Sequence, residues 1–208
     1  MMDAERKKTR ALRPTLSALE PITLLSAAVH PFAAAGIAAR PHQPAEVSVK
    51  ASVSVAGQNS GRVDLAKRIQ GSSRIALASV HVSGVRDNAT ANQNIRDTAA
   101  GRAAQRSRYG TAPGGSVSLS VDMLDGMANL SHRFSFRVSE IAGGSHSRGS
   151  RHYNGAAFDV DQIGGQAVSQ GSRYVADFMA MARRLGATEV LGPGDPGHST
   201  HVHVAWNR

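Results

Sequence analysis

The apolar residues of the chain follow helical spacing in four segments, all of them beyond position 60. Apolar side chains three or four positions apart favour an amphipathic helix. The spacing predicts helices over residues 63–69, 88–104, 118–130 and 173–185. The last segment is the clearest, because Val175, Phe178 and Ala182 fall on one face and Gly186 is a typical C-terminal stop.

Short runs of alternating apolar and polar or small residues indicate strands, because successive side chains of a strand point to opposite faces. The expected strands cover residues 75–82, 134–138, 157–160, 189–191 and 201–206, and polar loops fill 109–115, 143–155 and 192–197. The helices and strands are mixed without a regular βαβ order. We therefore expect an α+β domain with a mostly antiparallel central sheet and flanking helices.

The first 60 residues lack a sustained period and contain several prolines. A Val/Ser alternation over 47–55 predicts one strand near their end. Residues 22–39 are moderately apolar and follow a basic start, so they resemble a degraded export signal that His30 and Pro31 interrupt. An unstructured leader explains the same pattern. We expect a flexible leader over residues 1–60 and a folded domain over residues 61–208.

The composition narrows the chemistry of any site. The chain has no cysteine, which excludes disulfides and thiolate ligands, so a metal must be held by His, Asp, Glu or water. The formal net charge of +9 suits a polyanionic partner such as nucleic acid or an anionic wall polymer, although a solvated basic surface explains it equally. We find no nucleic-acid-binding signature. No stretch reaches the ~18 apolar residues that a membrane span needs.

Histidines gather near the C-terminal end. Five of the nine lie between positions 146 and 203, namely His146, His152, His198, His201 and His203. Residues two apart in a strand face the same side, so His201 and His203 point into one space. A converging pair of neutral imidazoles suits a divalent metal or a proton relay.

A carboxylate stands close to this group in the sequence. Asp159 lies between Phe158 and Val160 in an apolar strand, where it is costly to bury unless it is paired or bound to a metal. Gly155 lets the chain turn back, so His152 can reach Asp159. A structural Asp bonded to loop amides is the alternative. Together the two stretches supply a His, an Asp and a His, the ligand set of a catalytic zinc with one position open to water.

The combined spacing resembles a known group of proteins. His152-x6-Asp159 followed by His198-x2-His201-x-His203 is similar to the zinc peptidases that share the fold of D-alanyl-D-alanine carboxypeptidases and hedgehog domains. The histidine spacing looks most like that of the penicillin-insensitive murein endopeptidases. The resemblance covers about residues 60–208. It implies that His152, Asp159 and His203 are zinc ligands, that His201 acts as general base or stabilises the oxyanion, and that His198 supports the site.

The loop before the first ligand adds detail to the resemblance. Val138-Ser-Glu140, His146 and the stretch from Ser150 to Asp159 are similar to the zinc loop of hedgehog domains. Glu140 and His146 line this loop, where they could bind substrate or a second cation. With Ser150 and Arg151 they form the expected substrate-binding set.

Two positions depart from the family pattern. Many carboxypeptidases of the group carry a Glu shortly before the last His pair, but here the nearest acid is Asp195, so we favour His201 as the base. An Arg expected before the zinc loop is also missing from its usual turn. Arg137, Arg148 or Arg151 could replace it, and the sequence does not choose among them.

The sequence predicts a zinc-dependent peptidase, of the D,D-carboxypeptidase or endopeptidase type. It would hydrolyse peptide bonds in peptidoglycan stem peptides or cross-links, in the cell envelope or outside the cell. Its partners would be peptidoglycan peptides and anionic wall polymers, with no specific nucleic acid. The alternative is a hedgehog-like zinc domain that binds a partner without catalysis. A nucleic-acid-binding protein is a third hypothesis, which rests on the charge alone.

Overall fold

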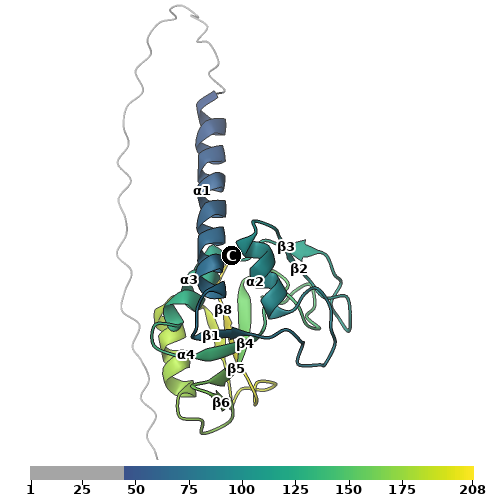
Figure 1. Ribbon diagram of the computed structural model, residues 1–208, viewed down its shortest axis with the longest axis vertical. Coiled ribbons are helices and arrows are strands. Elements are labelled where there is room, and N and C mark those ends of the chain that lie inside the picture. The colour runs from purple at the N-terminus through teal and green to yellow at the C-terminus, as the bar shows by residue number, and fades with distance from the viewer. Residues whose placement is uncertain (1–44) are drawn as a thin grey trace, which may run out of the picture. The chain divides into compact units, whose positions relative to one another are not determined.

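The computed structural model describes the chain from Ala45 to Arg208, and its side chains from Gly57 onward. The predicted export signal over residues 22–39 lies outside this part. The elements, in chain order, are α1 (Ala45–Gln70), β1 (Ile75–Leu77), α2 (Ala91–Ala99), β2 (Ala104–Gln105), β3 (Ser116–Val117), α3 (Val121–Leu130), β4 (Phe136–Glu140), β5 (Ala157–Ile163), β6 (Gln166–Ala167), α4 (Val175–Arg184), β7 (Glu189–Leu191) and β8 (Val202–Ala205) (Figure 1).

The central sheet has the strand order β1-β4-β5-β8-β7, and β6 pairs with β5. A separate two-stranded sheet joins β2 and β3. The α+β class is confirmed, but the predicted mostly antiparallel arrangement needs correction to a mixed sheet, because β1 runs parallel to β4. The chain reaches β4 from β1 through a long crossover that contains α2 and α3. A crossover of this length lets a strand enter in the same direction as its neighbour, which a tight hairpin does not.

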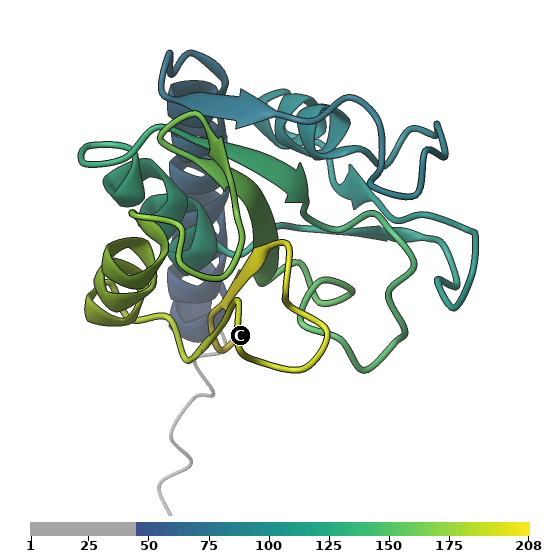
Figure 2. The same ribbon diagram turned by 90° about the horizontal axis from the view of Figure 1, so that it is seen from below.

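The helices enclose the core with one face of the sheet. Contacts link α1 to α2 and α3, and α4 to β7 and β8, and Figure 2 shows α1 running behind the strands. Side chains of β5 and β8 enter this core at alternate positions, including Phe158, Val160, Val202 and Val204, which are fully buried. The residues between them must therefore face the other side of the sheet.

The first helix is the largest difference from the sequence prediction. α1 begins at Ala45 rather than near Val63, and the strand predicted over 47–55 lies inside it. The Val/Ser alternation favours a strand locally, but whether such a segment forms a strand depends strongly on the residues and strands around it. A strand also needs a hydrogen-bonding neighbour, whereas a helix satisfies its backbone internally.

Several element boundaries also move. β1 ends at Leu77, so the rest of the predicted strand 75–82 belongs to the loop before α2. α2 begins only at Ala91, after Thr90 accepts a hydrogen bond from the backbone N–H of Gln93 as its N-cap. The strand predicted over 201–206 is β8 without its first and last residues, so His201 directly precedes it and Trp206 directly follows it. None of the helices within residues 45–208 combines the length and apolar character that a membrane crossing needs.

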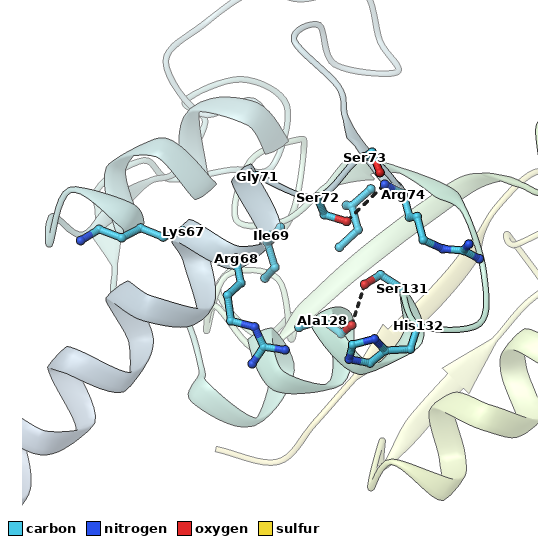
Figure 3. Close-up of a pocket in the computed structure, with 11 residues that line it drawn as sticks. Lys67, Arg68, Ile69, Gly71, Ser72, Ser73, Arg74, Ala128, Ser131 and His132 are labelled. Atoms are coloured by element: carbon cyan, nitrogen blue, oxygen red, sulfur yellow. Dashed lines mark hydrogen bonds between the residues drawn. The ribbon is translucent and has the colours of Figure 1, made fainter.

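A basic hollow of about 550 Å³ lies where α1 ends, lined among others by Arg68, Arg74 and His132 (Figure 3). Two of the hydrogen bonds drawn there fix its walls: the backbone N–H of Arg74 donates to Ser72 Oγ at 3.2 Å, and Ser131 Oγ donates to the Ala128 carbonyl at 2.7 Å. None of the predicted site residues lines this hollow.

The predicted domain boundary at residue 61 remains a prediction, and the burial along α1 suits it. Residues 57–60 are exposed, and the buried positions among the described side chains of α1 begin at Leu65 and continue with Ala66 and Ile69. We expect a chain that starts at Gly61 to fold with a Tm close to that of the full chain and to keep its metal content. Calorimetry and elemental analysis would check this. An insoluble shortened chain would mean that the preceding residues belong to the core.

Candidate metal centre

Asp159 and His203 meet because of the register between β5 and β8. The two residues are direct cross-strand partners in the antiparallel pair, on the face opposite the helices. Asp159 Oδ1 lies 3.0 Å from His203 Nδ1. Both side chains are buried, each at 7% exposure. The alternation that buries Phe158 and Val204 in the core therefore also places a carboxylate beside an imidazole on the other face.

His152 joins them from the loop between β4 and β5. Its Nδ1 lies 2.6 Å from the Ile141 carbonyl oxygen, so Nδ1–H donates and Nε2 carries the lone pair. This Nε2 lies 3.2 Å from Asp159 Oδ1 and 3.0 Å from His203 Nδ1. Gly155 makes the return of the loop possible: it has φ +66°, and a Cβ there would lie 3.0 Å from the Ser118 carbonyl oxygen.

Glu189 orients the second imidazole from the neighbouring strand β7. Its Oε1 lies 3.1 Å from His203 Nε2, a charge contact that favours the ring proton on Nε2 and the Nδ1 lone pair toward Asp159. A carboxylate behind a histidine in this way fixes the ring and raises its basicity as a ligand. The sequence reasoning placed Glu189 in a strand but did not assign it to the site.

The three donor atoms fit a metal ion. With the ring hydrogens on the far sides of the two rings, two nitrogen lone pairs and a carboxylate oxygen converge within 3.2 Å of one another. Lone pairs so close repel each other unless a cation or a proton lies between them. A tetrahedral zinc with bonds of about 2.0–2.1 Å places neighbouring ligands about 3.3 Å apart, close to the spacing seen here.

The pKa shifts of Asp159 and His152 indicate that this site favours a positive charge. When protons rather than a metal lie between the donors, the charge and hydrogen bonds of His152 and His203 outweigh burial, which alone raises the pKa of Asp159, and hold that pKa well below its usual range. For His152 the effect of burial has the opposite sign and lowers the pKa. The charge and hydrogen bond of Asp159 outweigh it and raise the pKa of His152 above its usual value. The buried carboxylate therefore stays charged and favours a cation beside it.

His146 lies next to this group and must be weighed as a ligand. His146, His152 and Asp159 each offer an atom within 4.8 Å of the others, so these three could also hold a metal. However, the His146 ring stacks on His152 at 3.9 Å with only 9° between the planes. The in-plane lone pairs of parallel rings do not converge on one ion. The shorter distances and converging lone pairs favour His203 as the third donor.

Three further imidazoles lie around the three donors. Burial, followed by the proximity of His152, lowers the pKa of His146 to about 3. Burial also lowers the pKa of His201, whose ring makes no hydrogen bond within residues 57–208. His198 lies beside His201 with 4.9 Å between ring centroids, and its Nδ1–H donates to the Pro196 carbonyl at 2.8 Å.

Two hollows meet at the donors. One, of about 460 Å³, contains Glu140; the other, of about 320 Å³, contains Ser150 and Arg151. His146, Asp159 and His201 line both hollows. The structure thus brings every predicted site residue to one region, but it separates Glu140 from Ser150 and Arg151.

The other polar candidates have partners of their own. Ser150 Oγ accepts from the Tyr153 N–H at 3.0 Å, and Arg151 donates to Asn207 Oδ1 at 3.1 Å. Asp195 Oδ2 accepts from the Gly192 N–H at 2.8 Å, which assigns it to the turn before β8.

Arg137 is the one of the three candidate arginines that lines the larger hollow. There it pairs with Asp161 through two hydrogen bonds of 2.8 and 2.6 Å. Arg151 lines the smaller hollow, and Arg148 lines neither of the two.

The sequence reasoning missed a second buried histidine site beside the larger hollow. His81 is 3% exposed, and its Nδ1 and Nε2 each lie 2.7 Å from a carboxylate oxygen, of Glu140 and Asp87 respectively. Burial lowers the pKa of His81, but the hydrogen bonds to the two carboxylates outweigh it and raise the pKa to about 9. No spacing in the sequence links His81 to Glu140, which lies 59 positions away.

Comparison with known proteins gives a partial match. The chain is 45% identical over 67 residues to the zinc D-Ala-D-Ala carboxypeptidase of Streptomyces albus G. The match is to a zinc peptidase. It covers 32% of this chain and 22% of the relative. No family model matches the chain, and no solved structure matches it. The partial match and the His/Asp group together point to a zinc peptidase.

Zinc content tests which residues are ligands. We expect one tightly bound zinc per chain, lost in His203→Ala and retained in His146→Ala, because only the first of these removes a converging lone pair. Glu189→Gln should weaken zinc by about 10- to 100-fold, as the loss of a carboxylate behind a ligand typically does. Elemental analysis and chelator competition would measure both. Loss of zinc in His146→Ala with retention in His203→Ala would reverse the assignment.

His81 links the carboxylates of Glu140 and Asp87, and we call this group the His81 bridge. The pH dependence of the unfolding free energy tests it. The pKa of His81 is raised from 6.5 to about 9 in the folded chain, so its contribution is complete below about pH 6.5 and is lost as the pH rises through 9. Zinc-saturated protein should lose about 1–3 kcal/mol of unfolding free energy over this window. His81→Gln should lose less, whereas the exposed control His132→Gln should follow the parent. Parallel curves for all three proteins would contradict the bridge.

Proposed function

We propose that the chain is a zinc-dependent peptidase that hydrolyses peptide bonds in peptidoglycan stem peptides or cross-links. The observation that carries the proposal is the convergence of His152 Nε2, Asp159 Oδ1 and His203 Nδ1 within 3.2 Å of one another. The partial match to a zinc D-Ala-D-Ala carboxypeptidase supports both the metal and the substrate class. Work on the wall implies a place in the cell envelope or outside the cell.

In this proposal His152, Asp159 and His203 hold the zinc. When bound, zinc would activate a water molecule and polarise the carbonyl of the scissile bond. The backbone carbonyl of Ile141 and the carboxylate of Glu189 keep both imidazoles in the tautomer that such binding requires.

His201 is the proposed general base. Its ring is neutral because burial lowers its pKa, it makes no hydrogen bond within residues 57–208, and it lines both hollows beside the donors. A neutral imidazole placed there can take a proton from water and return it to the leaving amine. His198 lies beside that ring and is held through Pro196, which supports its role as a helper of His201.

The two hollows suggest how a peptide would lie. They adjoin Asp159 and His201 from two sides, which leaves room for residues on both sides of a scissile bond. Glu140 and His146 would contact the substrate in the larger hollow. Arg151 and Ser150 would contact it in the smaller one, where the guanidinium suits a carboxylate of the peptide. The net charge of +9 supports an added attraction to anionic wall polymers.

Digestion of purified peptidoglycan is the direct test of this function. We expect the protein to release peptide fragments that mass spectrometry can identify, to stop when a chelator removes the metal, and to recover when zinc is restored. The fragments would also show whether a terminal residue or a cross-link is cut. A zinc-loaded protein that releases nothing would favour the alternative, a hedgehog-like zinc domain that binds without catalysis.

Two histidines in one strand region should separate chemistry from metal binding. We expect His201→Ala to keep zinc and to lose about 10²–10⁴-fold in kcat, the usual cost of a lost acid or base. His203→Ala should lose zinc and activity together. Zinc content and turnover of a defined stem peptide would be measured for each variant. Normal turnover of His201→Ala would move the search for the base to Asp195, Glu140 and His198.

A further inference from the structure

The His81 bridge joins the loop between β1 and α2 to the wall of the larger hollow. His81 Nδ1–H donates to Glu140 Oε2, and Nε2–H donates to Asp87 Oδ1, each at 2.7 Å. The second oxygen of Glu140 accepts from the Val82 N–H at 3.2 Å. Since both of its oxygens accept, Glu140 is held as a carboxylate in one orientation.

The bridge leaves a negative charge uncompensated. Two carboxylates and one imidazolium give the group a net charge of −1, and within residues 57–208 neither carboxylate forms an ion pair with any other cation. A carboxylate has about four acceptor sites, and His81 and Val82 occupy two of those on Glu140. Acceptor capacity therefore remains on Glu140.

Three carboxylates line the larger hollow, and their partners distinguish them. Asp161 is neutralised by the two hydrogen bonds of Arg137. Asp159 belongs to the proposed metal ligands. Glu140 is left as the carboxylate that is available to a ligand of the hollow.

Two glycines before His146 pack closely against Glu140 and its bridge, and one of them leaves Glu140 open to that space. A Cβ on Gly144, which has φ +83°, would lie 3.3 Å from Glu140 Cδ and 3.2 Å from His146 Nε2, so its absence keeps the gap between these side chains open. A Cβ on Gly143 would lie 2.7 Å from His81 Cε1, so this glycine packs directly on the bridging imidazole. The loop that carries His146 is thus fitted to the bridge.

We propose that His81 and Asp87 position Glu140 to bind an ammonium group of the substrate in the larger hollow. This inference rests on the proposed function and names the substrate class more closely: a peptide with a free amine near the scissile bond, such as the unlinked side-chain amine of a stem-peptide diamino acid. His81 and Asp87 are positioning residues, which act through Glu140. A charged hydrogen bond of this kind is worth roughly 10- to 100-fold in binding.

The test compares peptides that differ only in one charge. Stem peptides with a free amine and the same peptides acetylated at that amine would be used, with the amine placed on either side of the scissile bond. We expect zinc-loaded enzyme to prefer the free amine in one placement by roughly 10- to 100-fold in kcat/KM, mainly through KM. Glu140→Gln should reduce the ratio of kcat/KM between the two peptides to about 1.

Further variants separate positioning from simple stability. His81→Gln and Asp87→Asn should each reduce the ratio between the two peptides. The matched control is Asp97→Asn, which removes another buried carboxylate, on α2 and paired with Arg102, but outside the hollow. This control should leave the ratio unchanged. Zinc content and Tm would be measured for every variant.

The outcomes are distinct. Equal cleavage of both peptides by the parent enzyme would overturn the inference and leave the proposed function standing. Variants that slow both peptides by the same factor would show a structural role for the bridge and would also overturn it. Absence of cleavage by zinc-loaded parent enzyme would overturn the proposed function and, with it, the inference.

Discussion

The pairing of β5 with β8 is the constraint on which the rest of the site depends. The register that places Asp159 opposite His203 also places Phe158 opposite Val204 and Val160 opposite Val202. One face of this pair is driven into the helical core by apolar burial, and the same alternation presents the carboxylate and the imidazole on the other face. A slip of one residue would exchange the two faces, so the core and the candidate metal centre are specified together.

Groups behind the two histidines determine which ring nitrogen of each faces the metal position. A neutral imidazole can point either nitrogen at a metal, and here Ile141 selects the choice for His152 while Glu189 selects it for His203. On the other side of Asp159, the His81 bridge plays a comparable part for Glu140 at the wall of the larger hollow. The polar face of the sheet is therefore built from pairs in which one group fixes the orientation of a buried partner.

The sequence predicts those features of the fold and the site that depend on patterns of neighbouring residues. The alternation around Asp159 and His203 and the polar loop before Asp159 predicted which residues come together, and the antiparallel strands place them as expected. Sequence reasoning could not reach Glu189 or His81, because their partners are set by pairing between segments far apart in the chain. It also misjudged residues 47–55, where a Val/Ser alternation fits a strand locally but α1 forms instead.

Anomalous scattering at the zinc edge from crystals of the zinc-loaded protein tests the central claim most directly. The account predicts one strong peak within bonding distance, about 2.0–2.2 Å, of His152 Nε2, Asp159 Oδ1 and His203 Nδ1, with no contact to His146. A peak bound by His146 in place of His203, or no peak between β5 and β8, would contradict it.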